Sequence, residues 1–496
     1  MSNRYKIACL ALLASGCLGI SAVAQSDSKG LQIDWNKVTV TSKSTPTLQV
    51  VVNPQLVRGA HMHDGSFQAL HELGADYVRY VPWLPYPRLA VAELEPPKDG
   101  KTSWDFSHID PMLDDFMKAT AGHSVILNFS TMPAWMFKTD KAITFPSDPN
   151  EVFWDYTQGT ELRDPTMKEA ANYYARLLSW YTKGGFNDEF GKWHESGHHY
   201  KIAYWEVLNE IEAEHHWTPE QYTKFYDVVT AAMLKVDPKL KFMALALADP
   251  SHHPEMFEYF LNPANHSQGA PLDFISYHFY ASPRKDETPE NWQYTFFNQE
   301  EGFLNTVRYV EQIRKQYSPH TRTDLDELGV ILPTDNKPGD DVAPPIAYWN
   351  LAGALYADLY IQLTQMGIDV VGESQLVGYP TQFPSVSMMN WQTNKPNARF
   401  WVLKLLKDHF GPGDRLVKTD ASNDDLSVQA FQTNKGRSIL VVNKRLKSAE
   451  LTLPADFKAT HIEYVAPSTG DNPPAMRELS GGAIALEPNE VAVITE

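Results

Sequence analysis

The stretch that decides the fold is Lys201–Glu212, KIAYWEVLNEIE. It begins with aromatic and β-branched side chains, which are typical of a buried strand, and it ends in polar residues. We predict that Asn209 and Glu210 form the carboxyl-terminal tip of a barrel strand. Glu206 alternates onto the same face as Glu210 but lies deeper along the strand, so we expect it in an ion pair inside the barrel.

Strand-like and helix-like segments alternate on both sides of this stretch. The predicted strands are residues 56–61, 75–81, 124–129, 201–209, 241–248, 272–280, 324–327 and 368–373. Thr218 and Pro219 have the cap and first-residue chemistry of a helix start, and residues 346–366 form an apolar-striped helix. Eight alternations with nearly continuous apolar strands predict an α/β fold, a (β/α)8 TIM barrel, over residues 56–412.

The composition changes after the sequence FGPG at 410–413. Residues 413–496 contain short alternating strands such as LSVQAFQ and SILVVN, which are separated by turn signals such as Asn434-Lys435-Gly436. This pattern predicts a C-terminal all-β sandwich domain. Residues 25–55 include strands rich in Val and Thr that we expect to join the sandwich, because an isolated strand pair is only marginally stable.

The N-terminus has the pattern of a signal peptide. Arg4 and Lys6 precede an apolar segment, and Ala22-Val23-Ala24 is a cleavage site, so we predict a signal peptide over residues 1–24 and export to the periplasm or medium. A lipoprotein anchored at Cys17 is the alternative. The other cysteine is Cys9, so cleavage after Ala24 leaves a mature chain with no disulfide, thiol catalysis or cysteine-bound zinc. No later apolar run is long enough to span a bilayer.

The overall composition is that of a globular protein, with 43% hydrophobic and 21% charged residues in a chain of 496. The formal net charge of −18 argues against a nucleic-acid partner, because binding to phosphates requires clustered Lys and Arg. Thirteen Trp residues offer flat faces that suit sugar rings. The composition does not predict an oligomeric state.

Active sites of parallel barrels lie at the carboxyl ends of the strands. The polar and aromatic residues at or just beyond the predicted strand ends are His61, His63, Arg79, Trp135, Asn209, Glu210, His278, Tyr280, Glu327 and Glu373. Glu210 and Glu327 would face each other across the barrel mouth. Glycoside cleavage requires such a pair, in which one carboxyl donates a proton and the other is ionised. Arg79 would keep Glu327 ionised.

The sequence WEVLNE at 205–210, followed by DELG at 326–329, resembles the glycoside hydrolases of clan A. These are retaining enzymes on (β/α)8 barrels. The resemblance implies that Glu210 is the acid/base and Glu327 the nucleophile. It also implies that Asn209 binds the sugar 2-hydroxyl, and that Arg79 and Tyr280 are partners of the nucleophile.

Within the clan, the chain looks most like glycoside hydrolase family 39, which includes β-xylosidases and α-L-iduronidases. The supporting stretches are WDFSHIDPML at 104–113, NFSTMPAWM at 128–136, ISYHFY at 275–280 and the trailing β-sandwich. The resemblance implies a carbohydrate substrate and no cofactor or metal. Many relatives have Pro after the acid/base, where this chain has Ile211, which leaves the sugar open. Long segments at 136–163 and 186–200 favour exo action, because they could close one end of a cleft.

Several alternatives remain at this stage. Asp326 and Glu373 compete with Glu327 as nucleophile. His61-Met62-His63 also matches the zinc-binding start of amidohydrolase-type barrels, but of the further ligands only His278 fits. We therefore expect His61 and His63 to bind substrate or simply to pack.

Two further expectations complete the sequence-based account. We expect Trp391 and Trp135 to stack against sugar rings, with Trp83 and Trp217 as weaker candidates. A barrel that binds carbohydrate without cleaving it is the remaining functional alternative, and the presence of both glutamates argues against it.

Overall fold

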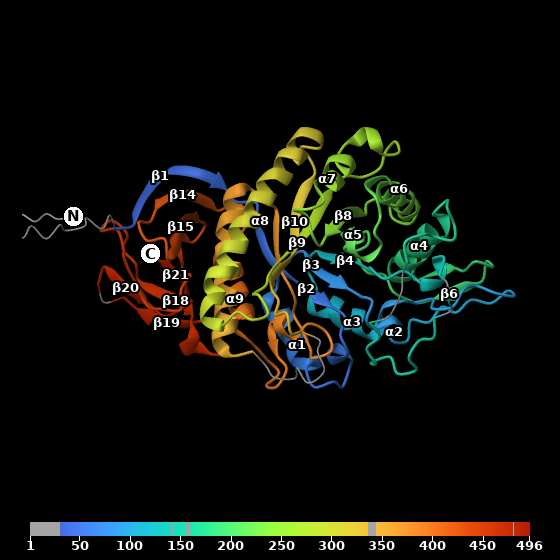
Figure 1. Cartoon of the computed structure of the whole chain (residues 1–496), viewed down its shortest axis with the longest axis horizontal. Helices are drawn as coiled ribbons and strands as arrows, with labels where there is room; N and C mark the ends of the chain where they lie inside the picture. Colours follow the sequence, from blue (N-terminus) through green and yellow to red (C-terminus); the bar gives the residue numbers. More distant parts are fainter. Residues whose placement is uncertain (1–29, 140, 142, 155–158, 336–343, 480) are drawn as a thin grey trace, which may run out of the picture.

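A computed structural model describes residues 30–139, 141, 143–154, 159–335, 344–479 and 481–496. The predicted signal peptide, with Cys17, lies outside the described residues. The chain forms a barrel surrounded by helices, and beside it a β-domain that contains the C-terminal strands and β1 (Figure 1). No helix in the described ranges is long and apolar enough to cross a membrane.

The barrel is closed and has the strand order β10-β11-β2-β3-β4-β7-β8-β9, with parallel pairing throughout. This confirms the predicted (β/α)8 fold. The strands are β2 (Thr45–Val51), β3 (Val78–Val81), β4 (Val125–Leu127), β7 (Tyr204–Glu206), β8 (Lys241–Leu247), β9 (Phe274–Ala281), β10 (Arg322–Val330) and β11 (Val370–Glu373).

Helices cover the outside of the barrel. They are α1 (His63–Leu73), α2 (Pro87–Ala90), α3 (Asp110–Ala119), α4 (Lys168–Lys183), α5 (Ile211–Glu214), α6 (Pro219–Val236), α7 (Pro254–Phe260), α8 (Pro289–Tyr317), α9 (Ile346–Met366) and α10 (Ala398–His409). Helix α6 begins with a capping box, in which Thr218 accepts a hydrogen bond from the Gln221 backbone N–H. Helix α9 is buried over most of its surface because it contacts α8, α10 and strands of the β-domain.

The predicted first barrel strand at 56–61 is wrong. Residues Pro54–Leu56 form a 3-10 helix, and turns lead from there into α1. The first barrel strand is β2, which the sequence analysis placed in a segment joining the sandwich. Six of its seven residues are buried because it lies between β11 and β3. The barrel therefore begins at residue 45 rather than at 56.

The β-domain contains a seven-stranded sheet in the order β1-β14-β15-β16-β21-β18-β19 and a separate pair, β17-β20. Strand β1 (Gln32–Thr41) pairs antiparallel with β14, so this N-terminal strand does join the C-terminal domain. A second hydrophobic core, which includes Trp35, Ile439 and Ile484, fills the space between these strands. The other strands are β14 (Arg415–Asp420), β15 (Leu426–Thr433), β16 (Gly436–Asn443), β17 (Ala449–Thr452), β18 (His461–Val465), β19 (Ala475–Glu478), β20 (Ala483–Leu486) and β21 (Val491–Thr495).

Candidate active site

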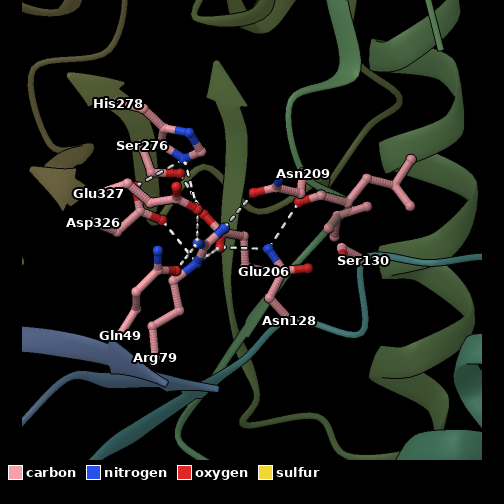
Figure 2. Close-up of polar contacts among 12 residues, drawn as sticks. Gln49, Arg79, Asn128, Ser130, Glu206, Asn209, Ser276, His278, Asp326 and Glu327 are labelled. Atoms are coloured by element: carbon pink, nitrogen blue, oxygen red, sulfur yellow. Dashed lines mark hydrogen bonds and ion pairs between the residues drawn. The ribbon is translucent and has the colours of Figure 1, made fainter. Parts of the chain in front are cut away.

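Arg79, on β3, is the centre of a buried polar network inside the barrel mouth (Figure 2). Its Nε lies 2.5 Å from Glu206 Oε2 and 3.0 Å from Asp326 Oδ2. Its two Nη groups donate to Gln49, Asn209 and Glu327 at 2.5–2.7 Å. The guanidinium is only 1% exposed, and this set of acceptors fixes its orientation.

Glu206 is part of the interior of the barrel, as the strand alternation predicts. It accepts hydrogen bonds from Arg79, from Asn128 Nδ2 at 2.7 Å and from the Ser276 hydroxyl. The residue is fully buried and does not line the pocket. Glu206 therefore holds Arg79 in place from below and is not itself available to a substrate.

Glu327, near the middle of β10 in a strand that runs on to Val330, receives two strong hydrogen bonds. Arg79 Nη1 donates to Oε1 at 2.5 Å, and the Tyr280 hydroxyl donates to Oε2 at 2.7 Å. Burial by itself raises the pKa of Glu327, but the charges of His278 and Arg79 and these two hydrogen bonds outweigh it and lower the pKa below the usual glutamate value. Glu327 is therefore held as a carboxylate.

A chain of side chains supports Tyr280 from behind. Gln49 Nε2 donates to Ser374 Oγ at 2.6 Å, and Ser374 Oγ lies 2.5 Å from the Tyr280 hydroxyl. The phenol has one proton, which its bond to Glu327 uses, so the Ser374 hydroxyl donates to the phenol oxygen. Gln49 also accepts from Arg79, so both partners of Glu327 belong to one network.

Glu210 lies four residues beyond the end of β7, immediately before α5, in a left-handed backbone conformation with φ of 42°. Its backbone N–H donates to the Ala246 carbonyl at 2.8 Å, which ties this turn to the neighbouring strand β8. Its side chain is 23% exposed, whereas that of Glu327 is 10% exposed. One carboxylate oxygen of Glu210 lies within 4.8 Å of one carboxylate oxygen of Glu327. A ring nitrogen of His278 also lies within 4.8 Å of each of these oxygens.

His278, on β9, links the two glutamates. Its Nδ1 lies 3.0 Å from Glu210 Oε1, and its Nε2 lies 3.6 Å from Glu327 Oε1. Burial lowers the pKa of His278, but the charge of Glu327 and the hydrogen bond and charge of Glu210 raise it above the usual histidine value overall. The three residues are the one group among the described residues that could hold a metal ion, but His278 Nδ1 is already directly paired with Glu210.

The two competing nucleophile candidates lie away from the pocket. Asp326 is 2% exposed, and burial together with neighbouring acids raises its pKa well above the usual aspartate value despite the charge of Arg79. Glu373 is 1% exposed and pairs with Arg399 Nε at 2.8 Å. Burial raises the pKa of Glu373 to about 7, with Arg399 opposing the change. Neither side chain lines the pocket.

The pocket above the network has an empty volume of about 610 Å³, which includes space open to solvent. Its floor is polar and its walls are largely apolar. The lining residues are Gln49, Val51, Val81, Trp83, Asn209, Glu210, Tyr280, Glu327, Ile331, Gln375, Phe383 and Val386. Gln375 is 3% exposed, and its Nε2 has no hydrogen-bond partner, so this donor is available to a ligand.

Five residues that the sequence analysis considered as substrate contacts do not line this pocket; one is the weaker candidate Trp217, which is buried and donates to the Thr160 carbonyl. His63 is the first residue of α1 and lies 3.0 Å from Asp115 on α3, while His61 is an exposed residue of the preceding turn. The indole N–H of Trp135 donates to the Glu93 carbonyl, and Arg163 covers its ring at 4.2 Å. Trp391 is 8% exposed and belongs to the hydrophobic core.

The His61 and His63 assignments fail because the motif lies in a turn leading into a helix rather than at a strand end. The structure adds five residues that the sequence analysis missed, and it promotes Trp83 from a weaker candidate to a pocket residue. The five are Gln49, Glu214, Ser374, Gln375 and Phe383. Three of these had a sequence signal: Gln49 is a polar residue inside the apolar run TLQVV, and Ser374 and Gln375 directly follow the predicted strand 368–373.

A closed (β/α)8 barrel with two glutamates facing one pocket from its fourth and seventh strands, β7 and β10, defines a barrel of the glycoside hydrolase class. The chain belongs to the glycosyl hydrolases family 39, whose model matches residues 19–329.

Individual relatives agree with this classification. The chain is 25% identical over 247 residues to a beta-xylosidase from Caldicellulosiruptor saccharolyticus, a match that spans 49% of this chain and 43% of that protein. An alpha-L-arabinofuranosidase from Thermotoga maritima superposes with a TM-score of 0.62 at 14% identity, over 94% of this chain and 99% of that one. A family 30 xylanase from Clostridium acetobutylicum superposes with a TM-score of 0.58 at 14% identity, over 94% of this chain and 99% of that one. These two structures share the fold.

Proposed function

We propose that this protein hydrolyses O-glycosidic bonds with retention of anomeric configuration. The observation that carries the proposal is that one carboxylate oxygen of Glu210 lies within 4.8 Å of one carboxylate oxygen of Glu327 across one pocket. Retaining glycosidases hold their two carboxyl groups about 5–5.5 Å apart, whereas inverting enzymes need a wider gap that admits a water molecule. The spacing therefore supports a double displacement.

In the first step, Glu327 attacks the anomeric carbon and Glu210 protonates the departing oxygen. The lowered pKa of Glu327 suits the nucleophile, because an attacking carboxyl must be ionised. Glu210 then removes a proton from water, which releases the sugar from Glu327. His278 contacts Glu210 and lies close to Glu327, so it can stabilise charge as the proton leaves Glu210 and returns to it.

We further propose that the sugar bound above the two glutamates is a neutral pentose, with β-xylosides as the first candidate. None of the lining residues in the described part of the chain is Lys or Arg, so none of them offers a cation to pair with the carboxylate of a uronide. The unpartnered Nε2 of Gln375 and the amide of Asn209 can bind hydroxyl groups. The beta-xylosidase relative supports the same choice.

A panel of aryl xylosides, arabinosides, galactosides and uronides tests this function with the purified mature chain. We expect turnover of a neutral pentoside and none of the uronide, and activity that survives a chelator. Binding of xylose or xylobiose without turnover of any aryl glycoside would instead support the carbohydrate-binding alternative.

The exo mode is a separate proposal, supported by the long segment 136–163, whose Trp154 packs against the pocket residues Trp83 and Phe383. Digestion of a xylo-oligosaccharide series tests it by product analysis over time. Release of single sugars from one end at all chain lengths supports exo action, and early internal cleavage contradicts it.

We also propose that the protein is exported, on the basis of the pattern in residues 1–24. The mass of the protein recovered from the periplasm or medium tests this. Cleavage after Ala24 is the expected result, whereas a lipid-modified chain starting at Cys17 would support anchoring.

A further inference from the structure

Three aromatic rings meet at one side of the pocket, and one of them, Trp154, is exposed to solvent. Trp83 follows β3, Trp154 lies in the segment between β4 and α4, and Phe383 lies beyond β11. Their ring centroids are 5.7–5.8 Å apart in all three pairs. Trp154 stands edge-on to both other rings, at 74° and 71°, and Trp83 and Phe383 line the pocket itself. We call Trp83, Trp154 and Phe383 the aromatic corner.

The corner lies on the route by which a leaving group would depart. Exposure rises from Glu327, with a side chain 10% exposed, through Glu210 at 23%, to Trp154 at 38%. The acid that protonates the leaving oxygen is therefore nearer to solvent than the nucleophile. The group attached to that oxygen must extend outward, past rings that line the same pocket.

Glu214, on α5, ties the corner to the catalytic residues. Its Oε1 accepts from the Trp83 indole N–H at 2.8 Å and from Asn209 Nδ2 at 3.1 Å. Asn209 in turn accepts from Arg79 and precedes Glu210 in the chain. Trp83 is thus held at a fixed position relative to Glu210, which is a requirement for a specific subsite.

The chemistry of the corner favours an apolar group. Its three side chains carry only two polar atoms, the indole nitrogens of Trp83 and Trp154, and the Trp83 N–H already donates to Glu214. Most sugar hydroxyls brought against these rings would lose water without gaining a partner, whereas an aromatic ring would make favourable edge and face contacts.

We propose that the aromatic corner is the leaving-group subsite and that it takes an aromatic aglycone, the phenolic part of an aryl glycoside. This inference rests on the proposed function, because it assigns the inner part of the pocket to the sugar.

The test compares equilibrium binding of two non-hydrolysed ligands, phenyl and methyl 1-thio-β-D-xyloside, by titration calorimetry. The wild type should prefer the phenyl compound. Trp154→Ala should reduce that preference about threefold to tenfold, the value of one aromatic pair, and leave methyl binding unchanged. Trp193→Ala is the matched control, because Trp193 is an exposed Trp, at 51%, on the separate β6 hairpin strand (Trp193–Glu195).

An unchanged phenyl preference in Trp154→Ala, or an equal loss for both ligands, would overturn the subsite. A thio-linked xylobiose that binds more tightly than the phenyl compound would also overturn it, in favour of a sugar-binding subsite. If the wild type hydrolyses aryl xylosides but binds the phenyl compound no better than the methyl compound, the aromatic subsite is refuted and the proposed function stands. A phenyl preference that Trp154→Ala abolishes, in a protein that hydrolyses nothing, refutes the proposed function alone.

Discussion

Tyr280→Phe removes one hydrogen bond from the proposed nucleophile and keeps the ring. In the native protein the phenol donates to Glu327 at 2.7 Å, and this bond is one of the contacts that lower the pKa of Glu327. Its loss therefore raises the pKa of Glu327. Because the nucleophile must be ionised, the acidic limb of kcat/KM should move to higher pH.

The magnitude follows from the strength of the lost bond. A hydrogen bond to a charged group contributes about 1.5–3 kcal/mol, and one pKa unit corresponds to about 1.4 kcal/mol, so the upper limit is a shift of about 1–2 units. Arg79 still donates to Glu327 in the variant, and Ser374 Oγ remains close by with its partner removed. We therefore expect a shift of about one unit.

The assay is the pH profile of kcat/KM for an aryl glycoside, with Tyr277→Phe as the control. Tyr277 lies on the same strand, is buried, and its hydroxyl has no hydrogen-bond partner. Tyr277→Phe should leave the acidic limb in place. An acidic limb that stays unmoved in Tyr280→Phe would refute the assignment of Glu327 as the group that Tyr280 keeps ionised.

Three further predictions concern the pocket residue Gln375, the network residue Ser374 and Asp324, a buried acid on β10. Gln375→Leu should raise KM for the glycoside about tenfold or more, because the variant lacks the buried N–H donor that meets a sugar hydroxyl. Gln375→Glu should show the same high KM, because a carboxylate cannot donate. An unchanged KM in Gln375→Leu would exclude Gln375 as a ligand. Asp324→Asn should stabilise the protein increasingly as pH rises above about 4, the usual pKa of an unfolded aspartate. Burial raises the pKa of Asp324 well above its unfolded value, so the folded wild-type protein loses stability as rising pH favours ionisation of this side chain. A difference in Tm between variant and wild type that does not change with pH would contradict this. Ser374→Ala should move the acidic limb in the same direction as Tyr280→Phe but by less, because it acts on Glu327 only through Tyr280.

The proposed catalytic pair was predictable from sequence because parallel barrels place their chemistry at or near the carboxyl ends of their strands. The sequence predicted strands that end at Asn209 and Glu327; in the structure β7 ends at Glu206 and β10 runs on to Val330, and Glu210 and Glu327 still line one pocket. Glu206 was predictable for a related reason, since strand alternation fixes the face on which a side chain lies. Arg79 and Tyr280 also followed from strand ends, and both contact Glu327.

The remaining residues depended on contacts between distant segments. His61-Met62-His63 was misplaced because LVRGAH, at 56–61, contains enough apolar residues to resemble a strand, although Gly59 has φ of 87° in a turn. The true first barrel strand, β2, is apolar enough to be recognised as a buried strand, but the sequence analysis assigned its segment to the sandwich domain. Glu214 and Phe383 reach the site from a short helix and a loop, where no periodic pattern marks a residue as facing a pocket.

Azide rescue of Glu327→Gly tests the role of Glu327 as nucleophile most directly. The variant should lose hydrolysis of an aryl glycoside, and azide should restore turnover by occupying the space of the missing carboxylate. The product should be a glycosyl azide of the anomer opposite to the substrate. Rescue by azide in Asp326→Gly or Glu373→Gly, with no rescue in Glu327→Gly, would contradict the assignment.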